Sequence, residues 1–256
     1  MENEIQQPEN IEPKVQLSVI DAISGTFMSP GETFQTIDVT PKRNYWLISI
    51  IICIVLGLIS SFLFLNDNEL VDKIMDKQKE KLYQSMDERV KSGQMSREEA
   101  NIAIEQAEKF MNPEGLFFKI SALGGSVITP FITMLVFSLI GIIIIKILKG
   151  NFMYLNLLNV ISLSMIIAAA GDLINMFLSV ITGDLTSVGL APLLKSSGIP
   201  DNINIALIGL NVFKVWSLAV MSIGIAKIGK IKIMPVMIII LVVYIIYSFI
   251  TASIQQ

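Results

Sequence analysis

Two oppositely charged residues, Asp172 and Lys214, each interrupt a long apolar segment of the sequence. A charged side chain at membrane depth costs several kcal/mol, about 2.5 to 3.5 on insertion scales, so such residues mark candidate functional sites. Asn175 lies one helical turn from Asp172, and Asn211 lies one turn from Lys214, so each charge has an amide within reach. This set could bind an ion, a proton or a lipid headgroup. The alternative is an ion pair that fixes the register of two helices.

Residue types exclude most other chemistry. The chain has no histidine, which excludes a histidine zinc site and a Ser-His-Asp triad, and its one cysteine, Cys53, lies in an apolar run. Neither an intramolecular disulfide nor a thiolate metal cluster can therefore form. The acidic residues of segment 66–119 lack the Asp-x-Asp-x-Asp-Gly order of a calcium loop. We expect no catalytic residues, no metal and no cofactor.

The composition is that of a membrane protein. Hydrophobic residues make up 53% of the 256 positions and charged residues only 16%, against about a quarter charged in a typical soluble domain. The net charge is −3, and no basic patch is dense enough for nucleic acid. The first forty residues are polar and acidic rather than a cleavable signal. The first apolar segment should therefore both target the chain and remain in the membrane.

Five apolar segments are long enough to cross the hydrocarbon core, which takes roughly 20 helical residues. They occupy residues 45–65, about 120–148, 155–182, 206–228 and 233–253. We therefore predict an all-α, polytopic integral membrane bundle with five transmembrane helices, the last four within 120–256. Asp172 and Lys214 would each lie about 5 Å from the midplane on the same side, as an ion pair requires. The segment 186–194 is too short to cross, and we interpret it as interfacial or re-entrant.

Orientation follows from the basic residues of the short loops, which favour the cytoplasmic side. One side of the predicted bundle collects Lys42, Arg43, Lys146, Lys149, Lys227, Lys230 and Lys232. The opposite side has Lys195 in its short loop and a C-terminal tail without charge. We predict a cytoplasmic N-terminus and an extracytoplasmic C-terminus.

Two extramembrane segments have helical patterns of their own. Segment 1–44 contains apolar residues at helical spacing from Leu17 to Phe27, then a second short helix with a Ser29-x-x-Glu32 capping box. It could bind a membrane surface or a partner, or it could cover the cytoplasmic face of the bundle. Segment 66–119 predicts an extracytoplasmic helical hairpin, with Gly93 ending the first helix and Ser96 capping the second.

Two motifs frame these segments. The first is Phe27-x-x-Pro30-x-x-x-Phe34-x-x-Ile37, which leads into the Tyr45-Trp46 start of a span. The second is Asn211-x-Phe213-x-x-Trp216, which continues to Ile223-Gly224-Ile225-Ala226-Lys227 and a short basic link. In this order they resemble the bacterial branch of the Yip family, polytopic proteins named for interaction with Ypt/Rab-type GTPases. The resemblance covers nearly the whole chain except the predicted hairpin.

The resemblance implies a five-span bundle with a cytoplasmic N-terminus, in the cytoplasmic membrane of a bacterium. In the eukaryotic branch it would imply a role in vesicle traffic and membrane shaping. The Asp-Leu-Tyr-Gly-Pro-like motif that marks those members is absent here, so GTPase binding is not carried over.

Three classes of function stay open from the sequence. The leading one is a membrane-organising or adaptor protein without catalysis. The second is a transporter, channel or lipid-moving protein that uses the Asp172 and Lys214 site. The third is an intramembrane enzyme, which would need a nucleophile with a base, a metal cluster or a carboxylate pair. Expected partners are membrane lipids, with other membrane proteins or a second copy as alternatives.

Overall fold

The computed structural model describes residues 16–40, 43–186, 188 and 211–254, and the extended elements of this described part are all helices. The helices are α1 (Val19–Met28), α2 (Pro30–Val39), α3 (Tyr45–Asn66), α4 (Asn68–Lys91), α5 (Arg97–Phe110), α6 (Leu116–Ile147), α7 (Tyr154–Thr182), α10 (Val212–Gly229) and α11 (Ile233–Ile254). The prediction of an all-α fold is thus confirmed.

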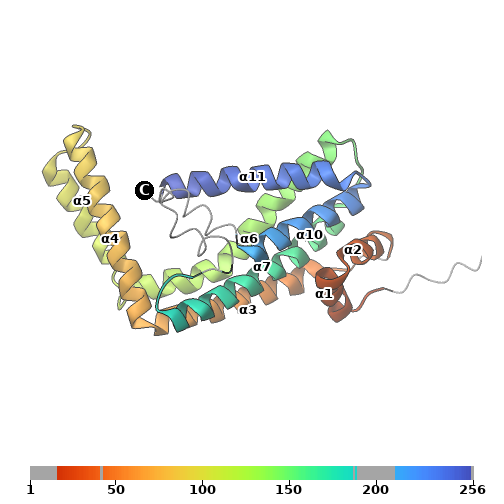
Figure 1. Cartoon of the computed structure of the whole chain (residues 1–256), viewed down its shortest axis with the longest axis horizontal. Helices are drawn as coiled ribbons and strands as arrows, with labels where there is room; N and C mark the ends of the chain where they lie inside the picture. Colours follow the sequence, from red (N-terminus) through yellow and green to blue (C-terminus); the bar gives the residue numbers. More distant parts are fainter. Residues whose placement is uncertain (1–15, 41–42, 187, 189–210, 255–256) are drawn as a thin grey trace, which may run out of the picture.

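Helix α7 is the central element of the bundle. It packs chiefly against α3 on one side and α10 on the other, while α6 lies against α3 and α11 against α10 (Figure 1). Its N-terminal half is buried almost continuously from Asn156 to Ile167. The core therefore lies where α7, α3, α10 and the N-terminal helices meet.

Four helices of the described part, α3, α6, α7 and α10, are long and apolar enough to cross a membrane. The chain is therefore an integral membrane protein by the length and composition of its helices. Helix α11 is equally apolar over its 22 residues, and its fully described part, Ile233–Ser248, counts as a shorter apolar helix. Most of the predicted re-entrant segment 186–194, and residues 206–210 of the predicted fourth span, lie outside the described residues.

Helices α1 and α2 cover one end of the bundle (Figure 1). Phe34 and Ile37 of α2 are buried against it. The predicted Ser29–Glu32 capping box is wrong, since Ser29 makes no side-chain cap bond. The reason is that Ser29 also ends α1, where its N–H donates to the Gly25 carbonyl at 2.8 Å. That bond holds Ser29 away from the extended conformation that a capping side chain needs.

Helices α4 and α5, which we call the α4–α5 arm, project from the opposite end of the bundle (Figure 1). The turn between them contains Gly93 in a left-handed conformation, φ 74°. The Ser96–Glu99 capping box at the start of α5 forms in both directions, as the sequence predicts. Four residues of the arm are buried but lie outside the main core: Leu70, Val71, Met75 and Ala100.

Candidate functional site

The two charged residues singled out by sequence lie together. Lys214 Nζ lies 3.5 Å from Asp172 Oδ1, which joins the first turn of α10 to the second half of α7. Their side chains are 33% and 50% exposed respectively in the isolated chain. The pair therefore sits on the flank of the bundle, partly covered by the described helices, rather than in its centre.

Asn211 lies next to both members of the pair. Its side-chain oxygen accepts the backbone N–H of Lys214 at 2.9 Å, which caps α10. Its side chain also lies close to the Asp172 carboxylate. One buried amide thus fixes the start of the helix that carries the lysine and lies close to the carboxylate opposite.

The side-chain oxygen of Asn175 binds a backbone group 13 residues further along the chain. Its oxygen accepts the N–H of Val188 at 2.9 Å, and the Val188 carbonyl accepts the N–H of Val212 at 3.0 Å. Asn175 is buried. It therefore ties the chain beyond α7 to the start of α10, and so helps to place Lys214 without touching it.

Two tyrosines of α11 complete the surroundings, and sequence reasoning missed them. Tyr244 lies near both Asp172 and Lys214, and Tyr247 lies near Lys214. Their rings lie 6.1 Å apart and tilted. A signal existed in the sequence, since they are the only tyrosines in the last predicted span. The site thus draws on three helices: α7, α10 and α11.

Close packing next to the charges explains why they can meet. A Cβ added to Gly171 would lie 2.7 Å from Phe213 Cδ2 and closer still to other atoms of that side chain. Gly171 and Phe213 are the immediate neighbours of Asp172 and Lys214. The missing side chain of Gly171 therefore lets α10 approach α7, and that approach brings the ionic groups within reach of one another.

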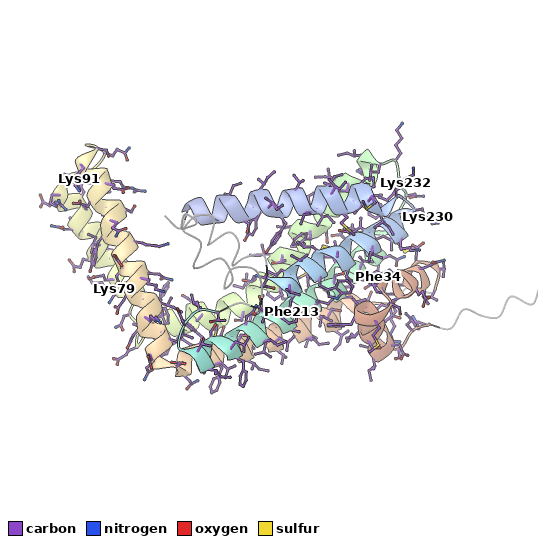
Figure 2. The ribbon with its side chains drawn as sticks, in the orientation of Figure 1. Phe34, Lys79, Lys91, Phe213, Lys230 and Lys232 are labelled. Atoms are coloured by element: carbon purple, nitrogen blue, oxygen red, sulfur yellow. The ribbon has the colours of Figure 1, made fainter. Side chains whose placement is uncertain are left out.

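The same packing recurs at a second glycine. A Cβ on Gly224 would lie 2.8 Å from Phe34 Cδ2 and even closer to Val160. Phe213 lies near the start of α10, and Phe34 packs toward its other end (Figure 2). Four residues of the family-like motifs therefore have packing roles. Phe34 packs against Gly224 of α10, and Phe213 packs against Gly171 of α7. Pro30 is the buried first residue of α2.

The two tryptophans of those motifs differ. The backbone N–H of Trp46 donates to the Asn159 side-chain oxygen at 2.9 Å, and Asn159 in turn donates to the Arg43 carbonyl at 2.8 Å. Asn159 is buried, and it provides a hydrogen-bond acceptor for a backbone N–H in the first turn of α3. The sequence did not indicate this role. Trp216, by contrast, is 42% exposed on the outer side of α10.

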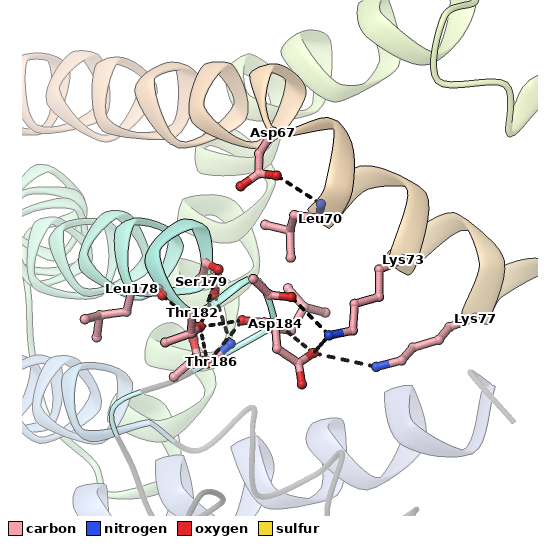
Figure 3. A network of polar contacts seen from close by, with 11 residues as sticks. Asp67, Leu70, Lys73, Lys77, Leu178, Ser179, Thr182, Asp184 and Thr186 are labelled. Atoms are coloured by element: carbon pink, nitrogen blue, oxygen red, sulfur yellow. Dashed lines mark hydrogen bonds and ion pairs between the residues drawn. The ribbon is translucent and has the colours of Figure 1, made fainter.

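Another polar cluster joins the α4–α5 arm to the end of α7 (Figure 3). Lys73 and Lys77 lie 3.6 and 3.7 Å from Asp184. Lys73 also donates to the carbonyl of Gly183 at 3.0 Å. Gly183 adopts a left-handed conformation, φ 62°, that ends α7. These contacts fix the base of the arm against the bundle at its solvent-exposed surface.

The Asp172 site offers one anion and one cation that already neutralise each other, with an amide and two phenols nearby. Across the described ranges, no three His, Cys, Asp or Glu side chains converge as metal ligands would. The site could therefore hold two helices together, or it could exchange partners with a passing ion if the pair opened.

Comparison with known proteins gives one match. The family model described as Yip1 domain matches residues 24–254. No curated protein and no solved structure matches the chain.

Proposed function

The chain belongs to the Yip1 domain family, and from this membership we propose that it is a non-enzymatic protein with a membrane-organising or adaptor role. Within that proposal the chain is of the bacterial branch and crosses the cytoplasmic membrane five times. The fifth crossing is α11, whose 22 residues carry no charge. The N-terminus is cytoplasmic, and the α4–α5 arm forms an extracytoplasmic helical hairpin.

The observation that carries the proposal is the direct contact between Asp172 and Lys214. A transport site needs polar groups that are free to receive a substrate. Here each charge has the other as its partner, and Asn211 caps the helix that brings them together. An ion pair that joins α7 to α10 favours a structural role for these residues in a helix bundle.

Extramembrane surfaces at both ends of the bundle suit an adaptor. On α1, Ile20 and Met28 are 78% and 87% exposed although both are apolar. At the other end the α4–α5 arm stands away from the core. Exposed apolar groups on a short apolar helix outside the predicted spans are a feature of interaction surfaces.

The competing proposal is a transporter, channel or lipid-moving protein that uses Asp172 and Lys214. Its support is the partial exposure of the pair, which leaves one side of both groups uncovered by described helices. Reconstitution with charge variants separates the two proposals.

If the pair is structural, Asp172→Asn or Lys214→Met alone leaves one charge unpaired in the membrane. We expect each single variant to lose roughly 1 to 3 kcal/mol of stability, between the values for exposed and fully buried pairs. The double variant should recover much of that loss, because neither charge remains. Melting of the four proteins in detergent measures this pattern.

The same proteins in liposomes test transport directly. We expect no protein-dependent proton, Na⁺ or K⁺ flux from the wild type. The wild type and the double variant should also capture the same membrane protein from native membranes. Wild-type flux that Asp172→Asn abolishes, with melting unchanged, would overturn the structural role and favour the transporter.

A further inference from the structure

Helices α6 and α10 end in the same way. Each closes with Lys-x-x-Lys, and the second lysine, Lys149 or Lys230, adopts a left-handed conformation with φ 56° or 53°. The following N–H then reaches back five residues, Gly150 to Ile145 at 2.8 Å and Ile231 to Ala226 at 3.0 Å. Glycine is the usual residue at such a position, because a side chain there costs about 1 kcal/mol or more. Both helices carry a lysine there instead.

The two helix ends lie side by side. A Cβ on Gly150 would lie 2.8 Å from Ile231 Cγ2 and still closer to the carbonyl oxygen of Gly229. Lys230 and Lys232 lie at the end of the molecule near α1 and α2, whereas Lys79 and Lys91 lie at the far end, on the α4–α5 arm (Figure 2). The basic groups of the short links are thus gathered at one face of the bundle.

Next to these lysines is a pocket of about 460 Å³, between the end of α10 and the start of α11. It is lined by Ala226, Lys227, Lys230, Ile231, Lys232, Ile233, Met234 and Pro235. This volume is within the usual range for a small-molecule site. Three lining residues are cationic and the other five are apolar. No ion pair among the described residues joins the three lysines to a carboxylate.

The pocket also receives the N-terminus of α11. Backbone N–H groups at a helix start have no partner within the helix and favour an anion. In the first turn of α11 these are the N–H groups of Ile233 and Met234, since Pro235 has none. Three ammonium groups and a helix N-terminus therefore define a site for a phosphate. Below them, Met234 and Ile238 on α11 are 66% and 56% exposed and provide an apolar surface that continues into the membrane. A free phosphate could not pack against that apolar surface, whereas the acyl chain of a lipid could.

From these features we infer that the pocket between α10 and α11 binds the headgroup of an anionic phospholipid. Lys227, Lys230 and Lys232 contact the phosphate, and the acyl chains lie along α11. The site is distinct from the Asp172 and Lys214 pair and does not depend on the adaptor role. It also explains why α10 has a lysine, Lys230, at a left-handed position where glycine is usual, since glycine has no ammonium group to contact the phosphate.

The test compares two variants that make the same change at the two helix ends. Lys230→Gly with Lys232→Gln removes two charges from the pocket, and glycine suits the left-handed backbone. Lys149→Gly with Lys146→Gln removes two charges from the same face but outside the pocket. A third variant, Lys230→Arg, keeps the charge. Each is purified in detergent, checked for an unchanged melting temperature, and mixed with equal amounts of phosphatidylglycerol and phosphatidylcholine.

Native mass spectrometry then counts the bound lipid. We expect wild type, the Lys149 variant and Lys230→Arg to retain one phosphatidylglycerol in preference to phosphatidylcholine. The pocket variant should lose about thirtyfold in that preference, the effect of two lost lysine–phosphate attractions. Equal loss in both double variants would show a general surface attraction and overturn the site. Displacement by glycerol phosphate or inorganic phosphate would show that the ligand is soluble phosphate and not a lipid.

Discussion

At the scale of single residues, glycines determine how closely the helices of this bundle approach. Gly171 and Gly224 each face an aromatic side chain with no space for a methyl group. Both lie on helices that contact each other along their length, α7 and α10. Small residues at such contacts are the usual means by which membrane helices pack, because the lipid offers no hydrophobic driving force between them.

Gly224→Ala tests this packing. The new methyl group would overlap Val160 and Phe34, so we expect a loss of about 1 to 3 kcal/mol. The control is Gly124→Ala on α6, where nothing lies within 4 Å of the added Cβ. That change should be neutral or stabilise by less than about 1 kcal/mol, since alanine favours a helix. Equal melting temperatures for the two variants would contradict the close contact.

The two charged residues of the candidate site and their pairing could be predicted from sequence, but the contacts of the neighbouring amides could not. Asp172 and Lys214 interrupt apolar runs, and that signal is visible in a single chain. Helical spacing places Asn175 one turn from Asp172 and Asn211 one turn from Lys214. This spacing predicts that each amide contacts the charged group nearest to it. Asn211 accepts the backbone N–H of Lys214 and caps α10, and Asn175 accepts the N–H of Val188, which lies beyond the end of α7. Spacing along one helix carries no information about such returning segments.

At the scale of elements, the α4–α5 arm is held by charge and capping rather than by a large core. Asp87 accepts hydrogen bonds from Lys91 and Arg97, at 2.7 and 2.8 Å. The bond from Lys91, followed by that from Arg97, lowers the pKa of Asp87. The backbone N–H of Ser96 lowers the pKa of Glu99 in the capping box. A lowered carboxyl pKa means that the folded arm favours the ionised form.

This predicts that acid loosens the turn of the arm. A carboxylate with a lowered pKa stabilises the fold above its unfolded pKa, about 4, and loses that contribution as pH falls through the folded pKa. We expect amide protection near Ser96 to fall as pH drops below about 4, with the amides of α7 unaffected. Hydrogen exchange, corrected for intrinsic rates, measures this. Asp87→Asn should reduce the pH dependence, and protection that is constant with pH would contradict the role of these carboxylates.

Helix positions were largely predictable because their signals are local. The apolar runs, Gly93 and the Ser96–Glu99 box each act through neighbours in sequence, and the structure has helices or helix ends at those places. The Ser29 box failed because two helices share one residue, and the end of α1 determined its backbone. The contact of Lys73 and Lys77 with Asp184 was not predictable either, since it joins segments more than a hundred residues apart.

At the scale of the whole molecule, the membrane bundle carries one extramembrane unit at each end. Helices α1 and α2 lie at one end, with the basic links near them, and the α4–α5 arm lies at the other (Figure 1). If the basic end is cytoplasmic, then the arm is outside. With five crossings, the C-terminus is outside as well. An even number of crossings would place both termini on the same side.

Cysteine labelling tests this arrangement most directly. Cys53 is buried and would be replaced by alanine, and single cysteines would be placed at Ser18, Ser85 and Ser253 in turn. In spheroplasts, a thiol reagent that cannot cross membranes should label the Ser85 and Ser253 positions at once, and the Ser18 position only after permeabilisation. Labelling of Ser18 and Ser253 under the same condition would mean an even number of crossings. Labelling of the Ser18 position in intact spheroplasts would contradict the cytoplasmic N-terminus.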